Sequence, residues 1–573
     1  MPELGILGNQ IIVDLDSSGN LKWPGNRAKR ICWGVGADDR WHFSEERASI
    51  RQSTDSNEVT PITRMKVPGG DITQRVEIIP WEGGSVTKIE FFNETPIPVA
   101  ISVLLFDFGQ VDINATIVNQ EKKPVIRTSK PVTISVFGEG YENLTNEIQK
   151  TEISGSSSAH DAGDDTALIF PLPHATKLEL LINNQNSDSL PAIEEVPRFE
   201  EIANGWQKHF DNGMGIQSDD NRLATVLNSS LRHLLIGSDQ EIASKFWNDD
   251  TVEHTTHLAI LALLSWGHSE SAKKLIYKTM ESAPTKLFAN SVSQETLYAI
   301  CLWAKYLEFS PVHNSLNSIS PWLQESIRSL LASLPGKRRI QKKSMNLEIA
   351  SIQAAIKIFV FLGQERLATE LQNQVHKIQE LKNQKDYSEP FKKFTTSYRH
   401  SIDNLADYLK IENTSVTLDQ VLAQTDATGS FITGLRQQDP TFSALFLLAI
   451  RAGFVQENKL LTGERQIQVA SSYNPDWIGI GMQVKDAPIS AGTLGYAIRW
   501  HGTSPALLWE AKTSSKVIIN AEVIDKNWSS TEHVGETLLA KQLAPETAVT
   551  IHSDTSLLRK TVNLESPEGG TFQ

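Results

Sequence analysis

The stretch FWNDDTVEHTTH, residues 246–257, places several chemically capable side chains directly in front of an apolar helical segment. Asp249 and Asp250 are adjacent carboxylates. An Asp before a helix either caps it by accepting a backbone N–H or stays available to exchange protons with a ligand. Trp247 offers a flat apolar face that either stacks on a ligand ring or packs against a neighbouring domain. The residue types alone leave both alternatives open.

Glu253, His254 and His257 raise the alternative of a metal site, because helix positions i and i+3 share one face. A metal site would need a matching ligand elsewhere, and the sequence does not identify one. We therefore expect polar first-turn residues, with no metal ion. No phosphate loop, paired-cysteine motif, Gly-x-Ser-x-Gly elbow or dinucleotide fingerprint occurs, so we expect no organic cofactor.

The hydrophobic pattern changes twice along the chain. Up to about residue 185, short alternating segments separated by turns predict an antiparallel β-sandwich. From about Trp206, apolar residues recur at helical spacing, and segments that are apolar all round alternate with amphipathic ones. That alternation is typical of an (α/α) toroid, in which inner helices are buried on both sides and outer helices on one. After Glu457 the pattern returns to strands.

We thus predict a multidomain α+β protein with an N-terminal antiparallel β-sandwich, an (α/α) toroid of helical hairpins and a small C-terminal β region. The predicted divisions are a sandwich over 1–185, a linker over 186–204, a toroid over 205–457, a C-terminal β domain over 458–560 and a tail over 561–573. An all-helical solenoid is a poorer alternative, because it leaves the leading β segments unexplained and no fixed period links the helices.

The composition excludes some classes of partner. The chain of 573 residues has a formal net charge of −14, whereas phosphate binding favours a basic surface, so we expect no nucleic acid. Its two cysteines, Cys32 and Cys301, do not suggest a disulfide framework. The N-terminus lacks a signal-peptide pattern, and no run of about eighteen apolar residues occurs. We expect a cytoplasmic protein without a membrane span, and leave its oligomeric state open.

Several segments, in order, resemble the six-hairpin glycosidases, and the glucoamylase family most closely. The opening GILGNQIIVDLDSSGNLKWPGNRAKR is similar to the start of that family's sandwich, and FDFGQ resembles its "RFDYG" strand. GWQKHF resembles the start of its barrel, and LALLSWGHSESAKKLI one of its helices. The run AGTLGYAIRWHGTSPALLWE is similar to the end of an actinobacterial-type branch. The residues that match the family's opening are Gly8, Asn9, Asp16, Gly19, Trp23 and Arg27.

The resemblance implies glycoside hydrolysis by two carboxylates, one that protonates the leaving oxygen and one that activates water. The family's acid lies in a Trp-Glu pair that would fall near Ala332, where this chain has none. Glu325 on the preceding segment and Glu348 beyond it are the nearby carboxylates, and neither fits the motif. We take Glu348 and Asp250 as the candidate catalytic residues.

The family's "WLRD" loop, which grips sugar hydroxyls, has two possible counterparts here. One is WNDD, residues 247–250, which keeps the Trp and the final Asp but has Asp249 in place of Arg. The other keeps the spacing to the helix and places residues 252–255 on the loop, losing all four. We favour the first, and predict that Trp247, Asp249 and His254 bind substrate.

The resemblance leads to two hypotheses of function. In the first, the chain is a glycoside hydrolase-like enzyme that acts on an α-glucoside-type substrate in the toroid cleft. In the second, the fold is retained without the catalytic pair, and the protein binds a glycan or serves as a scaffold. Both predict a carbohydrate ligand. The missing Trp-Glu pair is the observation that separates them.

Overall fold

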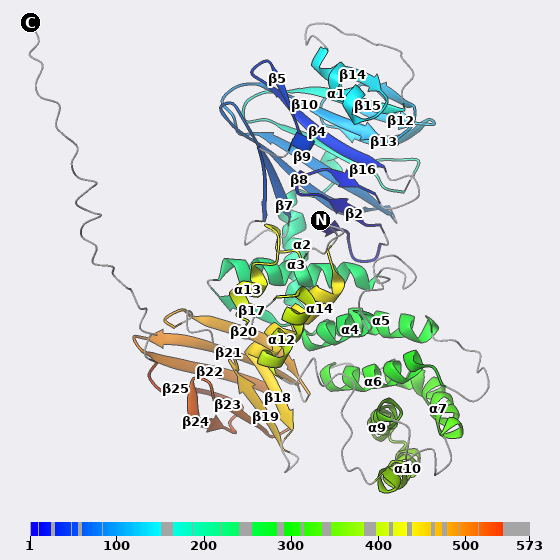
Figure 1. The fold of residues 1–573 in the computed structure, drawn as a ribbon, viewed down its shortest axis with the longest axis vertical. Helices are drawn as coiled ribbons and strands as arrows, with labels where there is room; N and C mark the ends of the chain where they lie inside the picture. Colours follow the sequence, from blue (N-terminus) through cyan, green and yellow to red (C-terminus); the bar gives the residue numbers. More distant parts are fainter. Residues whose placement is uncertain are drawn as a thin grey trace, which may run out of the picture.

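The computed structural model describes most of the chain. The described residues are 2–9, 11–23, 29–46, 49–54, 60–82, 84–150, 164–185, 187–218, 220–239, 255–282, 292–310, 315–334, 345–382, 397–411, 416–431, 438–459, 464–472, 478–490, 492–513 and 515–542. They form an upper β lobe, a helical middle and a lower β lobe beside the helices (Figure 1). This confirms the predicted fold class. The exact division into domains stays a prediction.

The upper lobe is built from two antiparallel sheets that face each other across an apolar core. The first sheet has the order β1-β2-β3-β4-β10-β15-β14, with β5 on β4, and the second β11-β12-β13-β16-β9-β8-β7-β6. The first sheet comprises β1 (Glu3–Leu4), β2 (Val13–Leu15), β3 (Leu21–Lys22), β4 (Arg30–Ala37), β5 (Arg40–Phe43), β10 (Val99–Phe106), β14 (Ile134–Gly138) and β15 (Asp165–Leu172). The second comprises β6 (Ile50–Thr54), β7 (Pro61–Val67), β8 (Gly70–Trp81), β9 (Gly84–Asn93), β11 (Val111–Asn114), β12 (Ile117–Gln120), β13 (Lys123–Thr128) and β16 (Lys177–Asn183).

Residues from both sheets meet in this core. Trp33 of β4 and Phe91 of β9 are almost fully buried, with ring centroids 5.3 Å apart. Burial of such rings contributes a large apolar area, which explains why the two sheets stay face to face. A helix that the strand pattern did not predict, α1 (Tyr141–Lys150), packs on β14 and β15 through Leu144 and Ile148.

The helical middle confirms the change to helical periodicity that the sequence predicts. Its elements are α2 (Phe199–Asp211), α3 (Asn221–Ser238), α4 (Thr255–Ser265), α5 (Ser269–Ser282), α6 (Gln294–Phe309), α7 (Ser315–Ser333), α9 (Asn346–Phe361), α10 (Glu365–Lys382), α12 (Tyr398–Leu409), α13 (Leu418–Leu422) and α14 (Pro440–Phe454). Helix α2 begins inside the segment predicted as a linker. None of the described helices is long and apolar enough to cross a membrane.

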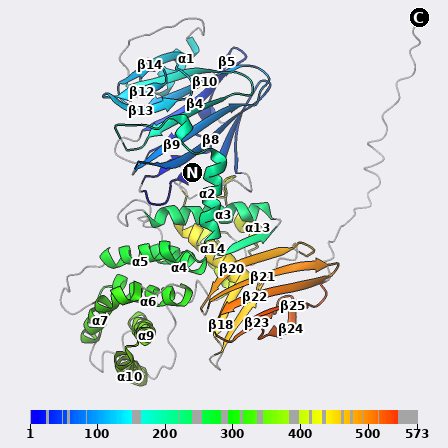
Figure 2. The same cartoon turned by 180° about the vertical axis from the view of Figure 1, so that it is seen from behind.

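Inner and outer helices differ as their sequences predict. Every residue of α14 and nearly every residue of α4 is buried, because their side chains are apolar all round. Helix α10 instead buries one stripe, formed by Ala368, Leu371, Val375 and Ile378 at spacings of three and four. Helices α4 and α5, α6 and α7, and α9 and α10 therefore form hairpins, each with an inner and an outer member (Figure 2).

The inner helices run parallel to one another. Thr255, the first residue of α4, is 2.8 Å from Thr441 at the start of α14. The ring of His257 in α4 lies against that of Tyr298 in the first half of α6, with centroids 4.7 Å apart and planes tilted by 32°. Ser351 of α9 donates a hydrogen bond to the carbonyl oxygen of residue 297 in α6. Four inner helices thus begin at one end of the helical layer and finish at the other.

The lower β lobe covers the finishing ends of α4 and α14. It consists of a five-stranded sheet, β17-β20-β21-β22-β25, and a four-stranded sheet, β18-β19-β23-β24. All strand pairs are antiparallel except β19 with β23. Their bounds are β17 (Gly215–Ser218), β18 (Val455–Lys459), β19 (Arg465–Val469), β20 (Met482–Ile489), β21 (Gly492–His501), β22 (Ser504–Thr513), β23 (Val517–Ala521), β24 (Asp525–Ser530) and β25 (Val534–Leu538).

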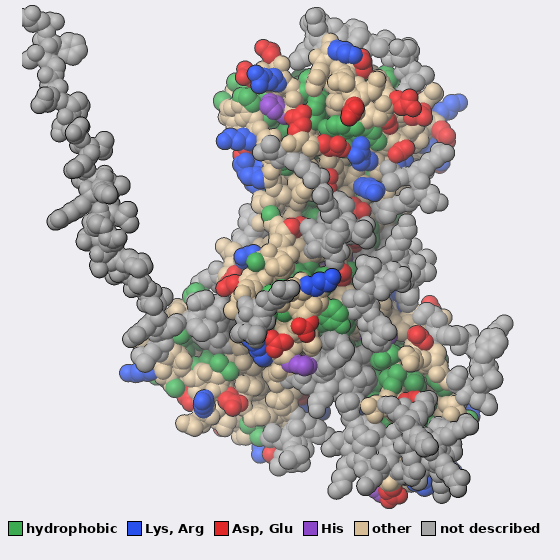
Figure 3. Space-filling view, in the orientation of Figure 1, with side chains coloured by type: hydrophobic (Ala, Val, Ile, Leu, Met, Phe, Trp, Pro, Cys, Tyr) green, Lys and Arg blue, Asp and Glu red, His purple; other side chains and the backbone are tan. Residues whose placement is uncertain are grey.

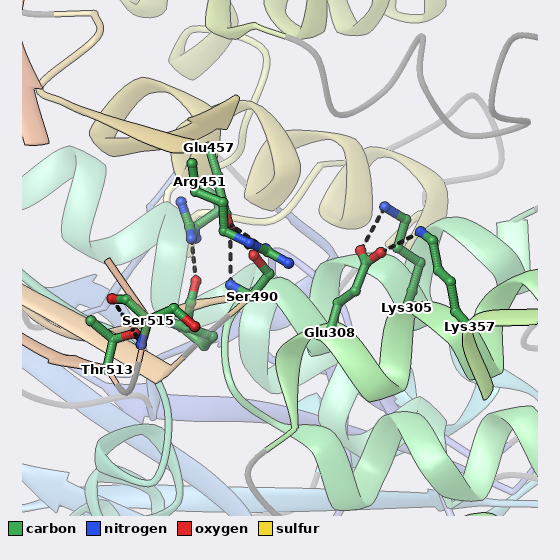
Figure 4. A network of polar contacts seen from close by, with 10 residues as sticks. Lys305, Glu308, Lys357, Arg451, Glu457, Ser490, Thr513 and Ser515 are labelled. Atoms are coloured by element: carbon green, nitrogen blue, oxygen red, sulfur yellow. Dashed lines mark hydrogen bonds and ion pairs between the residues drawn. The ribbon is translucent and has the colours of Figure 1, made fainter. Parts of the chain in front are cut away.

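A buried arginine joins the helices to this lobe (Figure 4). Arg451 of α14 donates hydrogen bonds to the carbonyl oxygens of Ser265, Val455 and Pro488. Burial lowers the pKa of Arg451 to about 10, so the side chain stays charged at neutral pH. A cation at helix C-termini satisfies carbonyl groups that have no partner within the helix. Close by in the same view, Glu308 of α6 is held between Lys305 and Lys357.

A buried ion pair joins the upper lobe to the helices. Arg232 of α3 donates two hydrogen bonds to the carboxylate of Glu77 on β8, at 3.0 and 2.6 Å. Glu77 is fully buried, and it also accepts a hydrogen bond from Thr60 at 2.8 Å. The Arg232 guanidinium lies over the ring of Trp206, 4.7 Å from its centroid. The ion pair is therefore buried, with Thr60 next to the carboxylate and the Trp206 ring next to the guanidinium.

We predict that Arg232→Ala lowers the free energy of unfolding by about 3–5 kcal/mol, because it leaves Glu77 buried without its counter-charge. The measurement is urea unfolding followed by circular dichroism. Arg328→Ala is the matched control, because Arg328 pairs with Glu325 on an exposed helix face, and such a pair contributes at most about 1 kcal/mol. Equal losses in the two variants would contradict the prediction.

Candidate functional site

The predicted site residues fall mostly outside the described residues. Trp247, Asp249, Asp250 and His254 belong to that part of the chain, so their roles stay predictions. Glu348 is described, and lies half-buried in the first turn of α9. It therefore lies at the end of the helical layer where the inner helices begin.

The described residues bring a polar cluster to this same end. We call it the helix-end cluster, and it comprises Thr255, His257, Tyr298, Asp439 and Thr441. These side chains come from α4, α6 and the start of α14, and all are buried or half-buried. Helix N-termini carry partial positive charge and unpaired N–H groups, so hydroxyls and carboxylates are stabilised there. The cluster thus offers both donors and acceptors to a polar ligand.

Asp439 is the most unusual carboxylate of the cluster. It precedes Pro440, the first residue of α14, and accepts a hydrogen bond from the Thr441 N–H at 2.8 Å. An Asp cap followed by Pro is a strong helix-start signal, so the local sequence explains this geometry. Burial raises the pKa of Asp439 above its ordinary value of 3.8, although the capping hydrogen bonds act the other way. A buried carboxyl of raised pKa is the type of group that acts as a general acid.

Beside this cluster lies a Ser–His–Glu arrangement. His233 of α3 is 3.1 Å from Ser443 Oγ through Nδ1, and 3.5 Å from Glu3 Oε2 through Nε2. The residue types match a nucleophile, a base and an orienting acid. However, Ser443 is 0% exposed and His233 1% exposed, which leaves no room for a substrate. We therefore assign these residues to packing between the helices and β1.

A loop that precedes α14 in the sequence packs against α3. Ser430 of this loop is 3.1 Å from Ser229 of α3, and Gln438 donates to the same Ser229. Gly429 has a φ of +76°, and a side chain there would meet the carbonyl of Thr225. Glycine is thus the residue that lets the loop lie this close to α3.

Glu253 and His254, two of the residues that raised the alternative of a metal site, lie outside the described residues, so that alternative is not tested. Among the described residues, no three His, Cys, Asp or Glu side chains converge on a point that could hold a metal ion. Glu325, the alternative carboxylate on α7, lies exposed in a pair with Arg328. The sequence pattern did not lead to Asp439 or His233. The Gln-Asp-Pro run could have located the first, but no local signal marks the second.

No protein-family model matches the chain, and no curated protein matches it in sequence. Solved structures are similar to it in fold. A kojibiose phosphorylase from the human microbiome has a TM-score of 0.46 at 10% identity, over 94% of this chain and 96% of that one. An α-L-rhamnosidase from Dictyoglumus thermophilum has a TM-score of 0.39 at 10% identity, over 84% of this chain and 59% of that one.

A family GH92 α-mannosidase from Bacteroides thetaiotaomicron has a TM-score of 0.30 at 8% identity, over 83% of this chain and 87% of that one. All three TM-scores are below 0.5, so we draw no conclusion about this chain from these three structures. The function of this chain has to be argued from its own geometry and residues.

We predict different effects of two changes at Asp439. Asp439→Ala removes the helix cap and lowers the free energy of unfolding by about 0.5–2 kcal/mol. Asp439→Asn keeps an acceptor at the cap and removes the ionisable group. The folded pKa of Asp439 is raised, so its contribution to stability is present at pH values below the unfolded pKa near 3.8 and is lost as pH rises through the folded value.

The Asn variant should therefore gain stability relative to the parent as pH rises from about 3.8 towards 7. Thermal unfolding of both proteins across this range measures the difference. Asp112→Asn, a change at an exposed position of β11, is the control and should give no such trend. A constant difference between parent and Asp439→Asn at every pH would contradict the raised pKa.

Proposed function

We propose that the chain is a carbohydrate-active enzyme that cleaves a glycosidic bond at the N-terminal ends of the inner helices. The observation that supports it is the parallel start of α14, α4, α6 and α9 at one end of the helical layer. Buried hydroxyls and a carboxyl of raised pKa gather there, and Glu348 lies in the first turn of α9. Asp250 precedes the first residue of α4 by only a few positions in the sequence.

The proposed substrate is an α-glucoside, as the resemblance to glucoamylases implies. The proposed mechanism uses two carboxyl groups, one as acid and one as base, with Asp250 and Glu348 as the candidates. Trp247, Asp249 and His254 would bind the sugar next to the bond that is cleaved. Asp439 is a further candidate acid, because burial favours its protonated form.

A second proposal is that the protein binds a glycan but does not catalyse its cleavage. It is favoured by the missing Trp-Glu pair near Ala332, together with the exposed position of Glu325. In that case the helix-end cluster would bind a glycan without cleaving it. The two proposals differ in one measurable property, which is turnover.

The test is hydrolysis of maltose and trehalose by the purified full-length protein, followed by glucose release. We expect Asp250→Asn and Glu348→Gln each to lower kcat about 10²–10⁴-fold, the usual contribution of a general acid or base. Glu365→Gln is the matched control, because Glu365 also begins a helix, but an outer one. Calorimetric binding of the same sugars without any turnover by the parent protein would reject the enzymatic proposal and support the second one.

A further inference from the structure

A second concave region lies where the upper lobe meets the loop of residues 425–431, and none of the helix-end cluster residues lines it. It is a groove of about 980 Å³, within the range of ligand pockets. One wall comes from the first sheet and α1, and includes Lys22, Arg30, Asp107 and Tyr141. The opposite wall includes Asp426 and Ala427 from the loop before α14. The groove therefore lies between the sandwich and the helical part.

Two loops of the same design contribute to this groove. One is Asp-Ser-Ser-Gly-Asn, residues 16–20, and the other is Asp-Ala-Thr-Gly-Ser, residues 426–430. In each, the Asp carboxylate accepts hydrogen bonds from the backbone N–H groups two and four residues further on. In each, the glycine has a φ between +76° and +79°. Each loop leaves its second residue, Ser17 or Ala427, exposed at the groove.

Three of the four carboxylates that line the groove are already held in place. Asp16 and Asp426 are bound by their own loops, and Asp165 accepts hydrogen bonds from the N–H groups of residues 107 and 140. These N–H groups offset part of the negative charge, as at a helix N-terminus. The described residues also provide no point at which three acidic groups converge. A bound metal ion is therefore not what this arrangement fits.

The remaining lining provides donors and an aromatic surface. Lys22 and Arg30 bring positive charge into the same wall as the carboxylates, and Arg30 also pairs with Glu45. The lining is thus of mixed sign, so an ion of either charge meets repulsion from part of it. Tyr141 packs against Phe106 with ring centroids 6.2 Å apart, and Arg30 lies 4.5 Å over that Phe106 ring. Interspersed acidic and basic side chains are visible over the upper lobe in Figure 3. Such a wall suits a neutral molecule with many hydroxyl groups and apolar C–H faces.

We propose that this groove is a binding site for a neutral oligosaccharide, which contacts the sandwich and the loop before α14 at the same time. The hydroxyls of the sugar donate to Asp107 and accept from Lys22 and Arg30. A sugar ring lies near Tyr141. The ligand class is inferred from the lining of the groove, and does not depend on catalysis at the helix ends.

The test is isothermal titration calorimetry of the full-length protein with maltoheptaose and cellohexaose, with spermine as a cationic comparison. We expect at least one neutral oligosaccharide to bind more tightly than spermine. Asp107→Asn replaces a charged acceptor by a neutral one, and Lys22→Met removes a charged donor. Each change should weaken that binding about tenfold, the difference that a charged partner makes to a hydrogen bond. Asn tolerates the φ of +61° at residue 107, so the first variant keeps the backbone.

Asp112→Asn and Lys66→Met are the matched controls, since both residues are exposed on the other sheet. They should bind the sugar as the parent does. Ser17→Trp and Ala427→Trp fill the groove from its two sides, and both should abolish binding if the ligand spans it. Thermal unfolding shows whether these variants are folded.

Three outcomes would overturn the proposal: no binding of either oligosaccharide, tighter binding of spermine, or sugar binding that the groove variants leave unchanged. The helix-end variants Asp250→Asn and Glu348→Gln separate this test from the proposed function. They should retain groove binding whether or not the protein has turnover. If the protein binds sugar in the groove but shows no turnover, only the proposed function fails. If it shows turnover but does not bind sugar in the groove, only the groove proposal fails.

Discussion

The ion pair between Arg232 and Glu77 is the contact on which the arrangement of the upper lobe and the helices depends. A buried carboxylate without a counter-charge is strongly unfavourable, so Glu77 is satisfied only when α3 lies against β8. The pair is bidentate, which fixes orientation as well as distance. The backbone of Gly8 also donates to Asp239 at the end of α3. Together these contacts set where the loop before α14 meets the sandwich.

The two ends of the helical layer satisfy opposite electrical requirements. Where the inner helices begin, the hydroxyls of Thr255 and Thr441 form a hydrogen bond with each other, and the carboxylate of Asp439 accepts one from the Thr441 N–H. Where α4 and α14 end, Arg451 donates to buried carbonyl groups that lack a partner within their helix. Helix dipoles favour this distribution, with acceptors at the N-termini and a cation at the C-termini. Because the inner helices pack in parallel, several partly positive N-termini lie side by side at one end of the layer, and partly negative C-termini lie together at the other.

Local pattern was enough to predict most elements. The strand patterns of β8, β9 and β10 and the helical spacing of α10 are each contained in one short segment, so they can be recognised without knowing the fold. Helix α1 was missed because its segment YENLTNEIQK is largely polar and buries only Leu144, Thr145 and Ile148. The Arg232–Glu77 pair could not be predicted, since its members are separated by 155 positions and neither has a local signature. The parallel start of the inner helices likewise depends on packing over long distances in the sequence.

Helix α14 ends at Phe454 and strand β18 begins at Val455, so no loop separates the helical part from the lower lobe. During synthesis this has a consequence for the order of assembly. The carbonyl of Pro488, one of the acceptors for Arg451, belongs to β20 and emerges from the ribosome well after α14 itself. Until then the Arg451 guanidinium lacks one of its three acceptors, and a fully buried cation in that state is costly. Completion of this end of the helical layer thus waits for the synthesis of β20, and a nascent protein stopped before β20 would lack the third acceptor of Arg451.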